Sequence, residues 1–360
     1  MPIIVDTDRI PARWAHVRVQ RSSMRHDKVV ARHGALRIAL INNMPDPALQ
    51  DTELQFFNLL SAAAGDVRVS IKLFSLPGIP RAGQARAHVT EYYSPLGDLW
   101  SARFDAAIVT GTEPRQPNLR NEPYWKALTD VLDWAAQNTA STILSCLAAH
   151  ASVLHSEGIE RHRMAEKCSG VFEIERASRH SLIEGVPQVY PLPHSRWNEL
   201  RERELKESGY TILTRSSDAG VDSFVRKTGH SQFLHFQGHP EYGAHTLFKE
   251  YRRDVKRFLQ GERDEYPSMP RGYFNAVARE MLERFQATAQ KERCAEVMDQ
   301  FPLAAVEQTL ERAWDSTSQR IYMNWLKYLH ANKVEPQKLA PVSRLSASAE
   351  LAHRKHSAVS

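Results

Sequence analysis

The stretch Ser141-Thr-Ile-Leu-Ser-Cys146-Leu-Ala-Ala-His-Ala151 decides the fold of this chain. Its first five residues have the apolar composition of a buried strand, and the residues after Cys146 have the composition of a helix. A cysteine at such a strand-to-helix turn is a nucleophile-elbow pattern, because the turn exposes the thiol at the carboxyl edge of a sheet. The first amides of the helix favour a thiolate and stabilise an oxyanion. We therefore interpret the chain as an enzyme that uses covalent catalysis.

A second motif supplies the partner groups that a catalytic thiol requires. A free cysteine is more often a buried apolar residue than a catalytic one. Here, however, the strand-like run Ser231-Gln-Phe-Leu-His-Phe236 is followed by Gly238-His-Pro-Glu-Tyr242. A histidine backed by a carboxylate is the usual base for a cysteine nucleophile, and these partners are commonly far apart in sequence. His239 and Glu241 are therefore predicted to activate Cys146.

Strand-like and helix-like segments alternate along the chain. Strands are predicted where apolar residues run together or alternate with polar ones, and helices where apolar residues recur every three to four positions. The predicted strands are 35–42, 67–74, 104–110 and 141–146, and the predicted helices are 52–60 and 125–137. This order favours an α/β fold, in which helices flank both faces of a mainly parallel sheet as a three-layer sandwich.

Residues with useful chemistry fall where the predicted strands end. In sheets of this class the active site lies at the carboxyl ends of the strands. Asn42-Asn43, Thr110-Gly111, Cys146 and Gly238-His239 all occupy such ends. Independent motifs therefore predict a site at one edge of the sheet.

The other segments complete the prediction of the fold. We expect a polar loop that enters a strand at 163–172, another loop at 193–196, and an amphipathic, cation-rich helix at 246–258. A helix at 321–329 is expected to pack its aromatic residues against the rest of the fold. The tail after Lys333 contains prolines and is rich in Ser and Ala, which is typical of a poorly ordered segment.

Composition places the chain among soluble globular proteins. It has 360 residues, of which 42% are hydrophobic and 25% are charged, and its mean hydropathy is −0.47. No apolar run approaches the roughly 20 residues of a membrane-spanning helix. Because residues 1–30 also lack the continuous apolar core of a secretory signal, we expect a cytoplasmic protein. The three cysteines have no close spacing, which favours reduced thiols over disulfides or a zinc site.

The charge pattern does not indicate a nucleic-acid-binding protein. The formal net charge is +5 and the pI is about 9.0, which suits an anionic substrate. Charges of both signs are mixed along the chain, and there is no basic stripe with interleaved aromatic residues. We expect neither a nucleic-acid nor a membrane partner.

Taken together, the motifs resemble the homoserine O-succinyltransferase family of methionine biosynthesis. The resemblance covers residues 35–330, and it leaves 1–34 as an N-terminal extension and 331–360 as a C-terminal tail. It is carried by Asn42-Asn-Met-Pro45, Thr52-Glu53, Ile108-Val-Thr-Gly111, Tyr124-Trp125, Glu166-Lys-Cys-Ser-Gly-Val171, Pro193-His-Ser-Arg196, Gly238-His-Pro-Glu-Tyr242 and Asn324-Trp-Leu326. The resemblance implies a class I glutamine amidotransferase-like (flavodoxin-like) fold and a cytoplasmic homodimer without a metal.

The resemblance also implies the catalytic roles. Cys146 would form an acyl thioester, His239 would accept the proton, and Glu241 would orient the imidazole. The amides of Leu147 and Gly111 are predicted to hold the oxyanion. The expected reaction transfers an acyl group from an acyl-coenzyme A co-substrate, through Cys146, to the hydroxyl of L-homoserine. No permanently bound cofactor is expected.

Substrate recognition follows from the same resemblance. Homoserine would be bound by Lys167, Ser195 and Arg253, whose guanidinium suits a carboxylate. Arg115 stands where the family's Gly accompanies succinyl transfer and its Glu accompanies acetyl transfer. If Arg115 faces the distal carboxylate of a succinyl group, succinyl-coenzyme A is favoured. The alternatives are that Arg115 faces solvent or pairs with Glu113, and acetyl-coenzyme A is the other possible donor. We favour succinyl transfer.

Three other interpretations stay open at this stage. The same architecture serves glutamine amidotransferase-like cysteine hydrolases, but their elbow normally has glycine two residues either side of the cysteine. This chain has Leu144 and Ala148 at those positions. A silent binding protein is disfavoured because the Cys, His and Glu set is intact. An acyltransferase that acts on a related amino acid such as serine fits the same residues.

Overall fold

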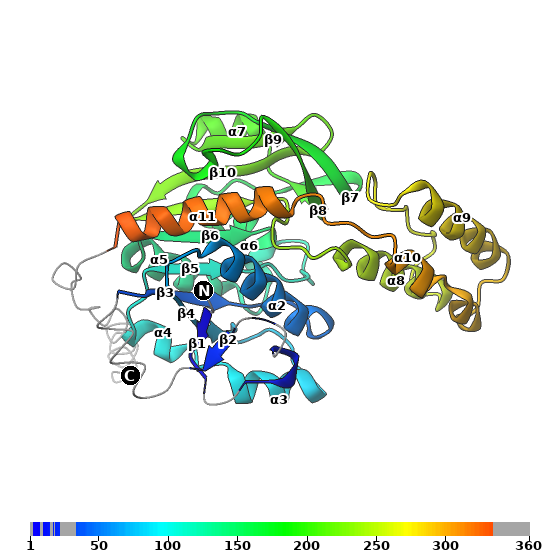
Figure 1. The fold of residues 1–360 in the computed structure, drawn as a ribbon, viewed down its shortest axis with the longest axis horizontal. Helices are drawn as coiled ribbons and strands as arrows, with labels where there is room; N and C mark the ends of the chain where they lie inside the picture. Colours follow the sequence, from blue (N-terminus) through cyan, green and yellow to red (C-terminus); the bar gives the residue numbers. More distant parts are fainter. Residues whose placement is uncertain (1–2, 8–9, 15–16, 18, 22–33, 334–360) are drawn as a thin grey trace, which may run out of the picture.

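The computed structural model describes residues 3–7, 10–14, 17, 19–21 and 34–333 (Figure 1). In this part of the chain eleven strands form one sheet. Seven run parallel, in the order β2 (Val19–Arg21), β1 (Ile3–Val5), β4 (Val69–Phe74), β3 (Leu36–Ile41), β5 (Ala106–Val109), β6 (Ser141–Ser145) and β11 (Ser231–Phe236). The sheet continues antiparallel through β10 (Gly220–Thr228), β9 (Thr211–Ser216), β7 (His162–Arg176) and β8 (Val189–Glu199). The prediction of an α/β fold with a mainly parallel sheet is confirmed.

Helices cover both faces of the parallel strands because alternate residues of these strands are apolar on both sides. In β3, Ile38 and Leu40 lie in one apolar cluster, and Ala39 and Ile41 lie in the opposite one. The helices that bury the first face are α2 (Asp46–Ala63) and α11 (Asp315–Ala331). The helices that bury the second face are α5 (Trp125–Asn138) and α6 (Leu147–Glu157).

The C-terminal helix α11 packs along α2 over the sheet (Figure 1). Its residues Ile321, Trp325 and Leu329 are buried. The Trp325 indole N–H donates to the Ser141 hydroxyl at 3.0 Å, which ties the helix to the strand that leads to Cys146. The predicted packing role of the 321–329 segment is confirmed. The predicted tail from 334 onward lies outside the described residues.

Part of the predicted N-terminal extension is built into the fold. β1 lies between β2 and β4, one strand in from the edge of the parallel sheet. Trp14 is buried, and its indole N–H donates to Oε2 of Glu53 at 3.1 Å. The Tyr93 hydroxyl donates to Oε1 of the same carboxylate at 2.6 Å. A buried carboxylate with these donors is stabilised, and it joins the N-terminal segment to α2.

The strand predicted at the end of 163–172 is present, but the loops predicted at the start of that segment and at 193–196 are wrong. Both segments lie inside strands, β7 and β8, which pair antiparallel with Ser169 opposite Ser195. Most residues in the first half of β7 are exposed or half-buried. A strand at the end of a sheet with one solvated face carries polar residues, so its composition is similar to that of a loop.

A group of helices follows the last parallel strand, β11, and projects away from the rest of the molecule (Figure 1). It consists of α8 (Thr246–Leu259), α9 (Ala276–Lys291) and α10 (Leu303–Glu307), with the 3₁₀ turn η4 (Ala295–Gln300). These elements bury an apolar cluster of their own. The shorter elements are η1 (Ala12–Trp14), α3 (Gly83–Tyr92), α4 (Gly97–Ser101), η2 (Leu119–Asn121), η3 (Ser181–Ile183) and α7 (Glu202–Glu207).

Candidate active site

Cys146 lies at the turn between β6 and α6. With φ of 51° and ψ of −108°, it is the one non-glycine residue of positive φ in the described part of the chain. An L-residue held in such a conformation costs on the order of 1–3 kcal/mol, and it persists where the surroundings fix it. The Cys146 amide donates to the Phe236 carbonyl at 2.7 Å, so β11 fixes the turn. The turn has the geometry of a nucleophile elbow.

His239 and Glu241 follow β11 at the same edge of the sheet. The His239 amide donates to the Pro193 carbonyl at 2.8 Å. Nδ1 of His239 lies 2.9 Å from Oε1 of Glu241, and this oxygen also accepts a hydrogen bond from the Ser145 hydroxyl at 3.0 Å. Because a carboxylate accepts the Nδ1 proton, Nε2 is left to face the thiol.

The charge of His239 depends on both of its neighbours. Burial lowers the pKa of the imidazole, but Glu241 and Cys146 raise it, and the balance brings the pKa of His239 to about 10. Nε2 has no conventional hydrogen-bond partner among the described residues. After Glu241, the group that raises its pKa is Cys146. A base coupled to the sulfur and oriented by a carboxylate is what a cysteine nucleophile requires.

Gly111 follows β5 and lies against the elbow. A Cβ atom at this position would stand 3.1 Å from the Leu147 nitrogen and 3.3 Å from the Ser145 carbonyl oxygen. Leu147 is the first residue of α6, so no carbonyl of its own helix accepts its N–H. The space beside this amide is open because residue 111 is glycine.

The residues expected to bind the acceptor come together on β7, β8 and α8. Nζ of Lys167 lies 3.4 Å from carboxylate oxygens of both Glu250 and Asp254. The Ser195 hydroxyl donates to Glu250. Nε of Arg253 lies 3.1 Å from Asp254. This patch holds two cations and two carboxylates, which is the charge set that complements a zwitterionic amino acid.

Glu250 and Tyr242 connect this patch to the His239 imidazole. The Tyr242 hydroxyl donates to Oε1 of Glu250 at 2.7 Å, and the Tyr242 ring stacks on His239 with the centroids 4.1 Å apart. Burial raises the pKa of Glu250, but Lys167 and the hydrogen bonds lower it below its ordinary value. Sequence reasoning assigned neither residue a role, although the i, i+4 spacing of Glu250 and Asp254 places both on one helix face.

Arg115 is exposed in the loop after β5. Its side chain forms no hydrogen bond or ion pair with the described residues, whereas its amide donates to Oε1 of Glu122 at 2.5 Å. The Gln116 amide donates to the same oxygen at 2.7 Å. Glu113 lies 3.7 Å from Arg257 instead of pairing with Arg115. The Arg115 side chain therefore faces solvent and does not pair with Glu113.

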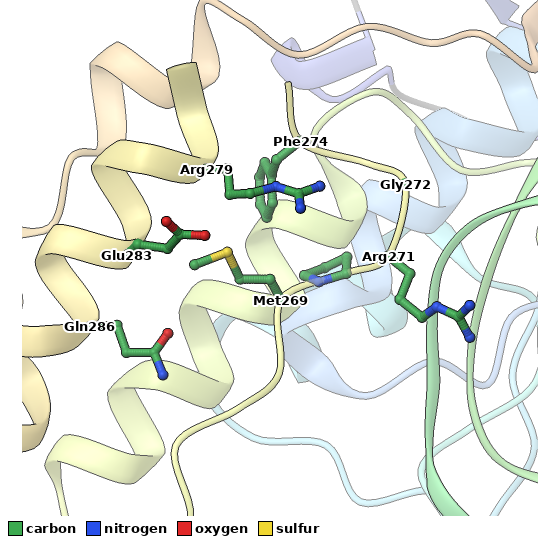
Figure 2. A pocket seen from close by; sticks show the side chains of 8 residues that line it. Met269, Arg271, Gly272, Phe274, Arg279, Glu283 and Gln286 are labelled. Atoms are coloured by element: carbon green, nitrogen blue, oxygen red, sulfur yellow. The ribbon is translucent and has the colours of Figure 1, made fainter. Parts of the chain in front are cut away.

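A cavity of about 470 Å³ lies between the segment 269–274 and α9. Figure 2 shows Arg279, Glu283 and Gln286 of α9 on one side of it. None of its lining residues belongs to the predicted site. Within residues 34–333 and the described N-terminal pieces, no group of His, Cys, Asp and Glu side chains is arranged to hold a metal ion. None of the helices there is long and apolar enough to span a membrane.

Comparison with known proteins shows one family along the chain. The model of the family described as homoserine O-succinyltransferase matches residues 2–335. The homoserine O-succinyltransferase of Rhodopseudomonas palustris is 44% identical over 291 residues, which are 81% of this chain and 87% of that protein. The one from Bradyrhizobium japonicum is 44% identical over 295 residues, which are 82% of this chain and 90% of that protein.

Solved structures similar to this chain include two glutamine amidotransferases. The one from Methylobacillus flagellatus has a TM-score of 0.45 and 13% identity, and the match covers 82% of this chain and 94% of that one. The one from Thermotoga maritima has a TM-score of 0.43 and 12% identity, and the match covers 82% and 99%. The sequence matches are far stronger, and they show that the chain belongs to the homoserine O-succinyltransferase family of acyltransferases.

Proposed function

We propose that the protein transfers the succinyl group of succinyl-coenzyme A to the hydroxyl of L-homoserine through a thioester on Cys146. One observation carries the proposal: the Cys146 side chain interacts with His239 of the His239 and Glu241 pair, and that pair is joined through Tyr242 to a patch of charges suited to an amino acid. Membership of the family supports both the acyl group and the acceptor.

In the first half-reaction the Cys146 sulfur attacks the thioester carbonyl of the donor. The bond between sulfur and the acyl carbon forms as the bond from that carbon to the coenzyme A sulfur breaks. The amides of Leu147 and Gly111 donate to the oxyanion of the tetrahedral intermediate. Protonated His239 gives its Nε2 proton to the departing sulfur, and Glu241 holds the ring in place.

In the second half-reaction homoserine attacks the acyl-enzyme. Arg253 and Lys167 take the carboxylate of homoserine, and Glu250 takes its ammonium group. The hydroxyl gives its proton to Nε2 of His239 as its oxygen bonds to the acyl carbon, and the Cys146 sulfur leaves. Transfer from a thioester to an oxygen ester is downhill, so no nucleotide is needed.

Intact mass spectrometry tests the covalent step. The protein incubated with succinyl-coenzyme A gains one succinyl group, and it loses that group when L-homoserine is added. Cys146→Ala stays unmodified, whereas Cys294→Ala serves as the control, because Cys294 is an exposed thiol away from the elbow. A protein that is never acylated, or that is acylated equally without Cys146, contradicts the proposal.

The same assay separates the other interpretations. A glutamine amidotransferase-like hydrolase forms its adduct with glutamine and releases ammonia, whereas a transferase does neither. A serine-specific enzyme discharges its acyl group to serine faster than to homoserine. We expect homoserine to be preferred, and acetyl-coenzyme A to acylate Cys146 more slowly than succinyl-coenzyme A.

We further propose that the enzyme works in the cytoplasm as a homodimer. The family resemblance supports the dimer, and the free thiols of Cys146, Cys168 and Cys294 fit a reducing compartment. Light scattering after size-exclusion chromatography measures the mass in solution, and a monomeric mass contradicts the dimer. Fractionation of the source cells tests the localisation, and a protein found outside the cytoplasmic fraction contradicts it.

A further inference from the structure

A polar cluster near Cys146 has no part in the mechanism above. It consists of Arg161, just before β7, together with Tyr124 and Glu122, just before α5. An exposed ion pair of 2.6 Å joins Arg120 to Glu160, so the segment that carries Arg161 lies beside the segment that carries Glu122 and Tyr124. The cluster thus joins two loops at the edge of the sheet that holds the elbow.

Two atoms of this cluster are buried without a partner. The Tyr124 hydroxyl and Oε2 of Glu122 form no hydrogen bond with the described residues, and both residues are about 4% exposed. A buried polar group without a partner typically costs about 1–3 kcal/mol. Native structures rarely keep such groups unless a ligand or water completes them. The Tyr124 hydroxyl is therefore a donor available to a ligand.

Arg161 is a cation in the same cluster without a bonded partner. It is half-buried, and it forms no hydrogen bond or ion pair with the described residues. Burial lowers the pKa of its guanidinium, while Tyr124, Cys146 and Glu122 act on it in the opposite direction. The guanidinium stays charged at neutral pH. A partly desolvated cation within electrostatic range of the nucleophile is a binding-site feature.

We propose that Arg161 and the Tyr124 hydroxyl bind the distal carboxylate of the succinyl group while its acyl carbon is attached to Cys146. The inference rests on the proposed function and names the residues that select the acyl donor. A planar guanidinium and a phenol hydroxyl are donors that match a carboxylate. The acyl and distal carbons of a succinyl group are separated by three C–C bonds of about 1.5 Å, or roughly 4 Å in all.

This assignment replaces Arg115 as the residue that selects the acyl group. The Arg115 side chain is exposed, and a solvated charge is screened and discriminates weakly between substrates. Glu122 does not prevent an anion from binding beside it, because its Oε1 accepts hydrogen bonds from the Arg115 and Gln116 amides. The guanidinium of Arg161 also opposes the Glu122 charge.

The decisive experiment compares two donors in one variant. In Arg161→Gln, kcat/KM for succinyl-coenzyme A is expected to fall roughly 10- to 100-fold, as for the loss of a charged hydrogen-bonded pair. With acetyl-coenzyme A the value should stay within about twofold, since the acetyl group has no distal carboxylate. This retained activity also shows that the variant is folded.

Control variants separate the binding role from structural effects. Arg163→Gln removes an exposed cation two residues away, which stacks on Trp197 at 4.2 Å. This variant should keep the wild-type kcat/KM for both donors. Tyr124→Phe should lower succinyl transfer roughly 3- to 10-fold and spare acetyl transfer. Equal losses with both donors in Arg161→Gln would show a structural role or a contact with coenzyme A, and they would overturn the proposal. So would loss of succinyl preference in Arg115→Gln alone.

A measurement on the unmodified protein covers the case in which the variants do not fold. Free succinate should slow the alkylation of Cys146 by iodoacetamide more strongly than acetate does at equal concentration and ionic strength. Equal protection by the two anions contradicts the proposal. A protein that transfers neither acyl group, or that transfers acetyl in preference to succinyl, refutes the proposed succinyl transfer itself. A protein that prefers succinyl, but whose Arg161→Gln variant loses the same factor with both donors, refutes only the role of Arg161.

Discussion

Replacing Glu250 with glutamine is expected to impair the second half-reaction and to spare the first. The Glu250 carboxylate accepts hydrogen bonds from the Tyr242 hydroxyl, at 2.7 Å, and from Ser195. It also lies 3.4 Å from Nζ of Lys167. Glutamine keeps the size and one acceptor oxygen, but it removes the negative charge that attracts the ammonium group of homoserine. The donor thioester carries no such group.

The size of the effect follows from the charge of this one contact. A hydrogen bond to a charged partner contributes about 1.5–3 kcal/mol, and a neutral one about 0.5–1.5 kcal/mol. Exchanging the carboxylate for an amide therefore costs about 1–2 kcal/mol in the transition state for homoserine. That range corresponds to a loss of about 5- to 30-fold in kcat/KM for homoserine.

The assay measures the two half-reactions separately. Rapid mixing with succinyl-coenzyme A alone, followed through the released thiol, gives the rate at which Cys146 is acylated, and it should match the wild-type rate. Adding homoserine to the acyl-enzyme, followed by intact mass, gives the slowed step. Glu207→Gln is the matched control, because Glu207 is an exposed glutamate paired with Arg203 at 2.8 Å.

An acceptor without an ammonium group makes this test sharper. 4-Hydroxybutyrate keeps the hydroxyl and the carboxylate of homoserine, and it is expected to be a weak acceptor for the wild type. Glu250→Gln should have nearly the same kcat/KM for 4-hydroxybutyrate as the wild type. If acylation slows as much as discharge does, Glu250 supports the fold or His239 instead of the acceptor. If homoserine and 4-hydroxybutyrate lose the same factor, the proposed ammonium contact is refuted.

Three further predictions concern the surroundings of His239. Glu241→Gln should bring the pKa of His239 below its value of about 10, as followed by histidine NMR, and an unchanged titration contradicts the pairing. Folding raises this pKa from about 6.5, so protonation of His239 adds to the free energy of unfolding. Relative to His239→Asn, this contribution is fully present below pH 6.5 and is lost as the pH rises towards 10. Gly238→Ala would place a methyl group 2.8 Å from Nε2 of His194, so urea unfolding should show a loss of about 1–3 kcal/mol. Unchanged stability would refute the crowding.

The sequence predicts the parallel half of the sheet well because its signals are local. Each of these strands is a short apolar run, and each amphipathic helix repeats its apolar residues at helical spacing. The strand predicted at 141–146 corresponds to β6, and the helix predicted at 125–137 corresponds to α5. Since the ends of parallel strands meet at one edge, the predicted Cys146 and His239 could be placed together before the structure was known.

The parts of the site that the sequence does not predict depend on long-range packing. Ser195 and Glu250 meet because α8 packs beside β7 and β8, and no local pattern records this contact. The neighbours of Arg161 come from a different loop. What distinguishes Arg161 from the exposed Arg115, which also lacks an ion pair, is that it is half-buried beside two unpartnered polar atoms. Burial of this kind is a property of three-dimensional packing, so composition and spacing did not identify Arg161.

In the proposed mechanism the His239 imidazole serves both half-reactions, because its acidity depends on whether the Cys146 sulfur is acylated. In the free enzyme Cys146 helps Glu241 to raise the pKa of His239, so the ring carries the proton that the departing coenzyme A sulfur needs. Once Cys146 is acylated its sulfur is neutral, and its contribution to the pKa of His239 is lost. The ring, which has just given up its proton, therefore has less tendency to take another from water. It is left as a base when the hydroxyl of homoserine arrives, and the next proton is taken up during ester formation.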